Sequence, residues 1–129
     1  MRNYIEVLNY QHPTYPGMNI RVSHTSEDIP IRDQFDDQVH DVDDLIDKVN
    51  RGIYDWFMVC VEVYYNGSLQ GSDYLGGCMY EDANDAIENG LDGYLEDMVD
   101  RAVNETLMLI KTMKDNIDAD FPQGVPEAA

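Results

Sequence analysis

Residues 56–65 read Trp-Phe-Met-Val-Cys-Val-Glu-Val-Tyr-Tyr, and Asn66-Gly67 follows them directly. The run is apolar or aromatic except at Glu62, a composition typical of a central strand whose sheet carries helices on at least one face. Asn and Gly both tolerate a positive φ, so the pair that follows predicts a tight hairpin turn. A weaker strand is then expected from Ser68 to about Leu75. We therefore expect an antiparallel pair of strands at the centre of the fold.

The N-terminal part of the chain predicts a second hairpin. Residues 4–10 are rich in β-branched and aromatic residues, and residues 19–25 alternate between apolar and polar side chains, as strands do. Residues 11–17 between them contain two prolines and a glycine, which favours a loop. Residues 26–38 are polar, acidic and interrupted by Pro30, so we expect another loop there.

A first helix is expected after Asp41, whose carboxylate can accept hydrogen bonds from the free amides of the first turn. Gly52 is suited to the left-handed position that closes a helix. Between them, the apolar residues recur at the spacing of one helix face and are Val42, Leu45, Ile46 and Val49. Three acidic residues fall on the opposite face and are Asp43, Asp44 and Asp47.

The C-terminal half predicts two more helices. Gly76-Gly77 is expected to break the strand pattern, and residues 81–88 can form a short acidic helix before a glycine-containing break. The longest helix is expected from Tyr94 to about Ile117. Its apolar stripe consists of Leu95, Met98, Val99, Ala102, Val103, Thr106, Leu107, Ile110, Met113 and Ile117.

These elements predict an α+β fold in the order β-β-α-β-β-α-α. The four strands form a mostly antiparallel sheet, and the helices pack on one face of it. Residues 1–120 are expected to form a single domain, and residues 121–129 a flexible C-terminal tail. Leu45, Val61 and Val103 are expected in the core.

The charge of the chain is the most informative part of its composition. Its 129 residues, of which 43% are hydrophobic, allow one domain with a real core. Twenty-six acidic residues face eight basic ones, which gives a formal net charge of −18. Eleven of the acids lie between Gly52 and Asp100, a stretch without Lys or Arg. Such a surface repels nucleic acids and anionic membranes, so direct binding to either is excluded, and it attracts strongly basic clefts.

The histidines and cysteines offer no catalytic motif. His12, His24 and His40 are isolated, and the sequence contains neither HExxH nor G-x-S-x-G. Cys60 lies within an apolar run, where a thiol is normally inert. Cys78 could stand at a helix start, which lowers the pKa of a thiol, but the surrounding acids oppose that effect. We therefore expect that the protein is not an enzyme.

Glycines and acidic runs offer no cofactor or metal site. Gly71, Gly76 and Gly77 match no phosphate-binding motif and favour a bulge and a tight strand-to-helix turn. Acids cluster at Asp41–Asp47 and at Glu81–Asp85, where a divalent cation would bind. Neither run follows the calcium-loop pattern, and a helix splays adjacent carboxylates apart. We expect neither a cofactor nor a built metal site.

The acidic residues as a set form the candidate binding surface. Asp92, Glu96 and Asp100 are expected to form a row with about 6 Å per step, of the order of the spacing of phosphates along a polynucleotide. Eighteen of the 26 acids are Asp, whose short side chain holds its charge in place. The candidate partner-binding residues are Asp36, Asp37, Asp43, Asp44, Asp47, Glu81, Asp82, Asp85, Glu88, Asp92, Glu96, Asp97 and Asp100.

In size, in charge and in the placing of Asp and Glu on helices, the whole chain resembles the small acidic proteins that phages and mobile elements encode to block host restriction or CRISPR nucleases by imitating DNA. The resemblance rests on no family-specific motif, so it assigns no role to a single residue. It implies a viral inhibitor of the anti-restriction or anti-CRISPR type.

We therefore expect a DNA-mimicking inhibitor whose partner is a basic nucleic-acid-binding protein, such as a host nuclease or a CRISPR or restriction complex. Two alternatives stay open: an acidic adaptor domain that docks a basic partner without mimicry, and a general acidic surface adapted to high salt. The sequence also leaves a homodimer open. The expected location is the cytoplasm, that of the host if a phage encodes the chain, because no apolar leader follows Met1 and two cysteines are too few for a disulfide framework.

Overall fold

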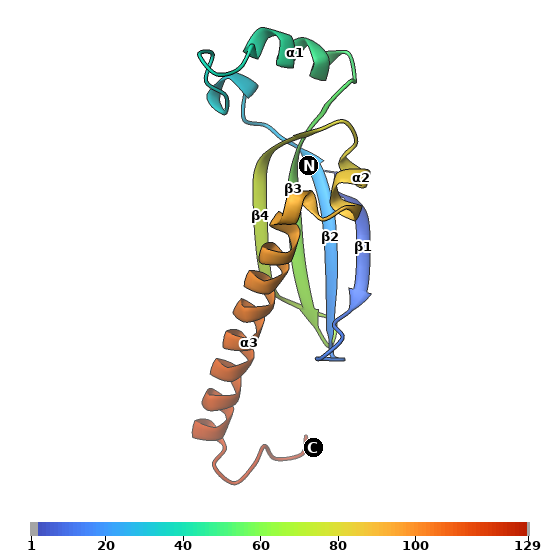
Figure 1. Ribbon diagram of the computed structural model, residues 1–129. Helices are drawn as coiled ribbons and strands as arrows, with labels where there is room; N and C mark the ends of the chain where they lie inside the picture. Colours follow the sequence, from blue (N-terminus) through green and yellow to red (C-terminus); the bar gives the residue numbers. More distant parts are fainter. Residues whose placement is uncertain (1–2, 129) are drawn as a thin grey trace.

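The four strands form one antiparallel sheet in the order β1-β2-β3-β4, so neighbours in the sequence are neighbours in the sheet (Figure 1). The computed structural model describes residues 3–128. The strands are β1 (Ile5–Gln11), β2 (Met18–Ser26), β3 (Asp55–Tyr65) and β4 (Ser68–Tyr80). The helices are α1 (Val42–Asn50), α2 (Ala83–Glu88) and α3 (Tyr94–Asp120), with two short 3-10 helices, η1 (Ile31–Asp33) and η2 (Leu91–Gly93). The predicted α+β fold is confirmed, although η1 lies within the segment predicted as a loop.

The hairpin between β3 and β4 turns at the predicted Asn66-Gly67 pair. Asn66 has a φ of 47° and Gly67 a φ of 86°, both in the left-handed region that these residue types tolerate. β3 lies between β2 and β4, as a central strand. The side chains at the centre of this strand have no exposed surface; they are Val59, Val61 and Val63.

β4 is longer than predicted because a bulge bends the strand instead of ending it. The pairing register with β3 shifts between Phe57 and Val59, so that Met58 alone opposes the Gly76-Gly77 pair. Gly77 has a φ of 67°, which costs glycine no steric strain. The prediction that Gly76-Gly77 breaks the strand is therefore wrong. Cys78 lies inside β4 and not at the start of a helix.

A second bulge, opposite the end of β3, brings β4 close to α3. The register shifts again at Gly71, whose amide donates a hydrogen bond of 3.0 Å to Thr106 Oγ1. The Thr106 hydroxyl donates in turn to the carbonyl oxygen of Ala102, at 2.8 Å. A Cβ on Gly71 would lie 2.0 Å from that carbonyl oxygen. The predicted bulge is confirmed, and Gly71 also allows the backbone of α3 to approach the strand.

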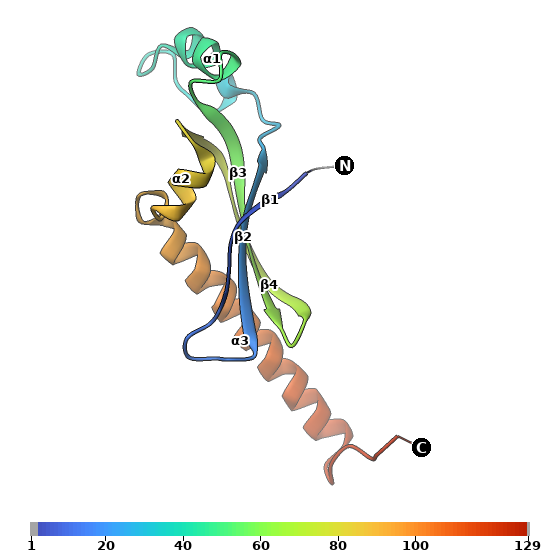
Figure 2. The ribbon, with the colours of Figure 1, turned by 90° about the vertical axis from the view of Figure 1, so that its right-hand side faces the viewer.

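α2 and the first half of α3 cover one face of the sheet (Figure 2). Both helices contribute buried residues to the core, among them Ala83, Ile87, Met98 and Ala102. Of the three predicted core residues, Val61 and Val103 are buried, with 0% and 6% of their surface exposed. Leu45 on α1 is only half-buried, because α1 does not pack on the sheet face.

α1 lies beyond one end of the sheet, and α3 extends beyond the other end (Figures 1 and 2). Asp41 caps α1 as predicted, since its Oδ1 accepts a hydrogen bond of 3.1 Å from the Asp44 amide. α3 continues past the predicted end to Asp120, and residues 111–120 are all exposed. Within residues 3–128, no helix is long and apolar enough to cross a membrane.

Candidate acidic interface

All thirteen candidate carboxylates are exposed, and they fall into two groups. The first, here called the α1 group, lies on α1 and the loop before it and consists of Asp36, Asp37, Asp43, Asp44 and Asp47. The second, the α2–α3 group, lies on α2, η2 and the first two turns of α3 and consists of Glu81, Asp82, Asp85, Glu88, Asp92, Glu96, Asp97 and Asp100. The two groups differ in whether basic side chains neutralise them.

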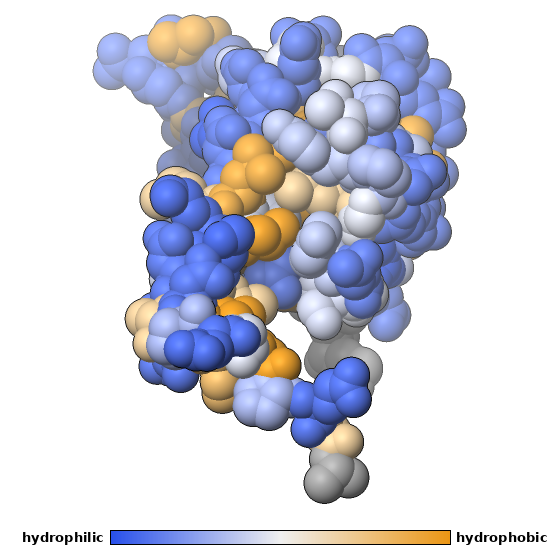
Figure 3. All heavy atoms as spheres, turned by 90° about the horizontal axis from the view of Figure 1, so that it is seen from below, coloured by the Kyte–Doolittle hydropathy of each residue, from blue (hydrophilic) through white to orange (hydrophobic). Residues whose placement is uncertain are grey.

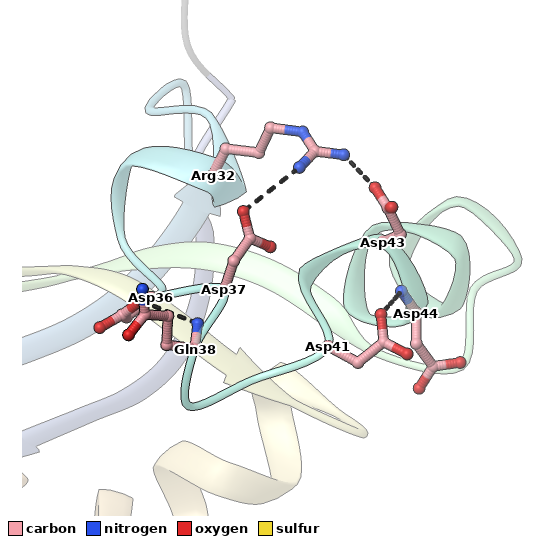
Figure 4. Close-up of polar contacts among 7 residues, drawn as sticks. All are labelled: Arg32, Asp36, Asp37, Gln38, Asp41, Asp43 and Asp44. Atoms are coloured by element: carbon pink, nitrogen blue, oxygen red, sulfur yellow. Dashed lines mark hydrogen bonds and ion pairs between the residues drawn. The ribbon is translucent and has the colours of Figure 1, made fainter.

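Four of the five carboxylates in the α1 group form ion pairs with nearby bases. Arg32 contacts Asp43 through Nη2 and lies 3.9 Å from Asp37 through Nη1 (Figure 4). Along the helix, Lys48 lies 2.9 Å from Asp44 and Arg51 lies 3.3 Å from Asp47. The remaining member, Asp36, accepts a hydrogen bond of 2.9 Å from the Gln38 amide. The negative charge of the α1 group is therefore largely neutralised by basic side chains of the same chain.

The α2–α3 group has no such compensation. Among residues 3–128, none of its eight carboxylates takes part in an ion pair. Arg101, the first base after this acidic stretch, lies 3.0 Å from Asp73 on β4 instead. Eight negative charges therefore face solvent from adjacent segments of the chain.

Three members of the α2–α3 group are held by hydrogen bonds to neutral partners. Asp82 caps α2 by accepting from the Asp85 amide at 3.0 Å. Asp85 itself accepts from the side chain of Asn89 at 3.1 Å. Asp92 accepts a hydrogen bond from the Tyr80 hydroxyl at 3.1 Å. The pKa of Tyr80 is raised to about 12, mainly by burial and secondly by this hydrogen bond. These contacts orient the carboxylates without removing their charge.

The predicted row of Asp92, Glu96 and Asp100 is only partly formed. Glu96 and Asp100 lie one turn apart on α3, as expected. Asp92 lies outside that helix, in η2, and has a left-handed φ of 56°. The turn between Gly90 and Gly93 separates the short helix from the long one, so the carboxylates follow a bent path and not one straight row.

Two acidic residues that the sequence did not single out are structural. Glu27 accepts hydrogen bonds from the amide of Gly77 at 2.8 Å and from that of Ile29 at 3.1 Å. Asp55 accepts from the amide of Ala83, at the start of α2, at 2.9 Å. Both accept hydrogen bonds from backbone amides distant in the sequence, so they help to hold the fold together. The contacts to Gly77 and Ala83 span 50 and 28 residues, and no local pattern signals them.

Two of the surface hollows are lined in part by polar or charged side chains. One, of about 610 Å³, lies between the end of α1 and the start of α2 and is lined in part by His24, Asp55 and Ala83. The other, of about 500 Å³, lies on the sheet face that the helices leave open, around Arg21. Arg21 Nε lies 3.1 Å from a carboxylate oxygen of Glu6, so this base is already paired.

The cysteines and histidines have local roles in the structure. Both cysteines are free and buried. Burial, and to a smaller extent Glu27, raises the pKa of Cys78 to about 11. Burial also raises the pKa of Cys60. His24 Nε2 lies 2.7 Å from Asn84 Oδ1, and His12 Nδ1 accepts backbone amides of its own loop. Within residues 3–128, no three or more His, Cys, Asp or Glu side chains are grouped so that they could hold a metal ion.

Comparisons with protein-family models, with curated proteins and with solved structures found no match for this chain. No residue role is therefore transferred from another protein. The candidate interface rests on the charges and contacts of the chain itself.

Proposed function

We propose that this protein is a nucleic-acid-mimicking inhibitor. Its α2–α3 group occupies the DNA- or RNA-binding groove of a basic protein, such as a host restriction or CRISPR nuclease. The carboxylates take the positions of phosphates against Lys and Arg side chains, and their long-range field speeds the encounter.

The observation that carries the proposal is the absence of an ion pair at all eight carboxylates of this group within residues 3–128. A surface carboxylate that already has a basic partner gains less from a second one. Unpaired carboxylates retain their full attraction for cations, and their mutual repulsion within the chain falls when a basic groove covers them.

The α1 group has a smaller role in this proposal. Arg32, Lys48 and Arg51 would have to leave their carboxylates, or be carried into the groove with them, before that group could bind a basic surface. Neutralising each group separately therefore tests which of the two binds the partner.

Capture of the partner tests the proposal. The chain is immobilised and exposed at low salt to a lysate of the cells in which it naturally occurs, and bound protein is then eluted with duplex DNA. We expect a basic nucleic-acid-binding protein to be released, because DNA and the inhibitor compete for one groove.

A matched pair of variants assigns the surface. The five-amide variant carries Glu81→Gln, Glu88→Gln, Glu96→Gln, Asp97→Asn and Asp100→Asn, and it spares the carboxylates that cap α2 or accept hydrogen bonds. The α1 variant carries Asp37→Asn, Asp43→Asn, Asp44→Asn and Asp47→Asn. We expect the five-amide variant to lose the partner and the α1 variant to retain it. A partner that stays bound when DNA is added would instead indicate an adaptor, and the absence of any DNA-displaced protein would contradict the proposal.

A further inference from the structure

The apolar stripe of α3 continues past the end of the sheet. Over the first half of the helix the stripe is buried, as at Met98 and Ala102. Beyond the sheet the same stripe is open to solvent: Met113 is 53% exposed and Ile117 is 40% exposed. Figure 3, which views the molecule from below, shows a band of apolar atoms bordered by hydrophilic ones.

The spacing of this stripe is that of a helix pair. Its residues recur at alternating intervals of four and three and are Val99, Val103, Thr106, Ile110, Met113 and Ile117. A seam with this average spacing of about 3.5 residues is the pattern by which two helices pack together over several turns. The sheet covers the first part of the seam. The second part has the same spacing of apolar residues, but nothing in the described chain packs against it.

The C-terminal segment of the same chain does not cover it. Residues 121–128 are all exposed, among them Phe121 at 41% and Val125 at 62%. Phe121 directly follows the last turn of α3 and adds exposed apolar surface at that end of the helix. The face therefore stays uncovered within the part of the chain that the structure describes.

We propose that a second copy of this chain covers the face, through antiparallel packing of the two projecting helix segments, residues 109–121. This inference does not depend on the proposed function. It concerns the end of the molecule away from α1, and it leaves the α2–α3 group free in each copy.

The charges of the segment favour a second copy in antiparallel orientation. Lys111 and Lys114 lie at its start, and Asp115, Asp118 and Asp120 lie at its end. An antiparallel neighbour sets the basic half of each segment against the acidic half of the other. A parallel neighbour would set like charges against each other. Within one chain, Lys111 pairs with Asp115 and Lys114 with Asp118, so the segment is nearly neutral in a strongly acidic protein.

The same orientation separates the acidic surfaces. With the twofold axis near Asp115, the two copies of Asp100, the member of the α2–α3 group nearest the contact, lie on opposite sides of it, roughly 45 Å apart at 1.5 Å per residue. Charges separated by several Debye lengths, each about 8 Å, repel only weakly. A parallel pair would bring the two α2–α3 groups side by side. Self-association through this segment is therefore compatible with a net charge of −18.

Sedimentation equilibrium tests the proposal. The wild-type chain, 14.8 kDa as a monomer, should approach twice that mass as its concentration rises. Association should strengthen at about 0.5 M NaCl, because salt screens the net repulsion and not the apolar contact.

Met113→Glu should weaken association by more than about a hundredfold, since it places an unpaired carboxylate in the seam. Met113 is exposed in the monomer, so the melting temperature should stay close to that of the wild type.

Met108→Glu is the matched control. Met108 lies on the same helix and is 71% exposed, but it points away from the seam. The same substitution there should leave association unchanged. Equal loss in both variants, or a wild-type chain that stays monomeric at every concentration, would overturn the proposal. A monomeric chain that captures another protein only when Met113 is intact would assign the face to that protein, and the proposal would likewise be wrong.

Disulfide trapping tests the orientation. With the twofold axis near Asp115, Met113 of one copy faces Ile117 of the other, and both side chains are exposed in the single chain. A mixture of Met113→Cys and Ile117→Cys chains should therefore form the mixed disulfide faster than either chain links to itself. Faster self-linkage of each variant than of the mixture would indicate a parallel pair and contradict antiparallel packing.

Discussion

Gly71 allows α3 to pack directly on the sheet. Any Cβ at this position would clash with the Ala102 carbonyl oxygen, at 2.0 Å. Gly71→Ala should therefore lower the free energy of unfolding by about 1–3 kcal/mol or more, because the helix must move away from the strand. Urea unfolding measures this loss.

Gly17→Ala is the control for this prediction. A Cβ on Gly17 would meet the ring of Tyr65 at 2.9 Å, and an exposed side chain can rotate away. We expect a clearly smaller loss of stability there. Equal losses in the two variants would show that the contact between Gly71 and α3 is not as close as described.

The Cys78 thiol gives the protein a predictable sensitivity to alkaline pH. Its pKa is raised from 9.0 to about 11, mainly by burial and secondly by Glu27. Below pH 9 the thiol is neutral in both states and its contribution is fully present; between pH 9 and 11 the unfolded chain ionises first, so stability falls. Cys78→Ala should lose less stability than the wild type between pH 8 and pH 10.5 or so, as measured by urea midpoints. Parallel losses would contradict the assigned burial of this thiol.

At the scale of single elements, the sequence predicted what depends on neighbouring residues. The turn at Asn66-Gly67, the cap at Asp41 and the stripe of α3 each follow from residues a few positions apart. The continuation of β4 through Gly76-Gly77 could not be predicted, because a bulge depends on the register of the partner strand. The position of α1 beyond the sheet is likewise a tertiary property.

The features of the candidate site likewise divide into those that depend on neighbouring residues, which the sequence predicts, and those that depend on the tertiary fold, which it does not. The exposure of the carboxylates on α1 and at the start of α3 could be predicted from helix periodicity. The pairs of Lys48 with Asp44 and of Arg51 with Asp47 have i, i+4 spacing and could also have been predicted. The contact of Arg32 with Asp43 could not, since it depends on the path of the loop before α1.

Neutralising the two acidic groups should affect stability differently. The five-amide variant should keep or raise the melting temperature, because it removes repulsion between unpaired charges. The α1 variant should not raise it, because it leaves three bases without their carboxylate partners. Calorimetry at low salt and at about 0.5 M NaCl would measure both, and the differences should shrink as salt screens them. A large loss in the five-amide variant would mean that these carboxylates are structural.

At the scale of the whole molecule, charge and apolar surface lie in different places. The uncompensated carboxylates lie on α2 and the start of α3, and the open apolar seam lies at the other end of α3 (Figure 1). If both proposals hold, this separation would let one molecule bind a basic partner and a second copy at the same time. Salt should distinguish the two contacts, since it weakens the first and strengthens the second.

The affinity of the captured partner for this chain should also fall less steeply with salt than the affinity of that partner for DNA. A protein surface lacks the dense condensed counterion layer whose release drives DNA binding. Titrations of the captured partner with the chain and with duplex DNA, at several salt concentrations, give both slopes. A steeper slope for the chain than for DNA would contradict this view of the interface.

Binding kinetics of the captured partner distinguish a DNA-mimicking inhibitor from an adaptor. The rates are measured for the wild-type chain, the five-amide variant and the α1 variant, each with and without duplex DNA. If the chain imitates DNA, DNA and the chain should exclude each other. The five-amide variant should then associate at least about tenfold more slowly, while the α1 variant stays near the wild type. A ternary complex in which DNA and the chain are both bound at full affinity would contradict mimicry.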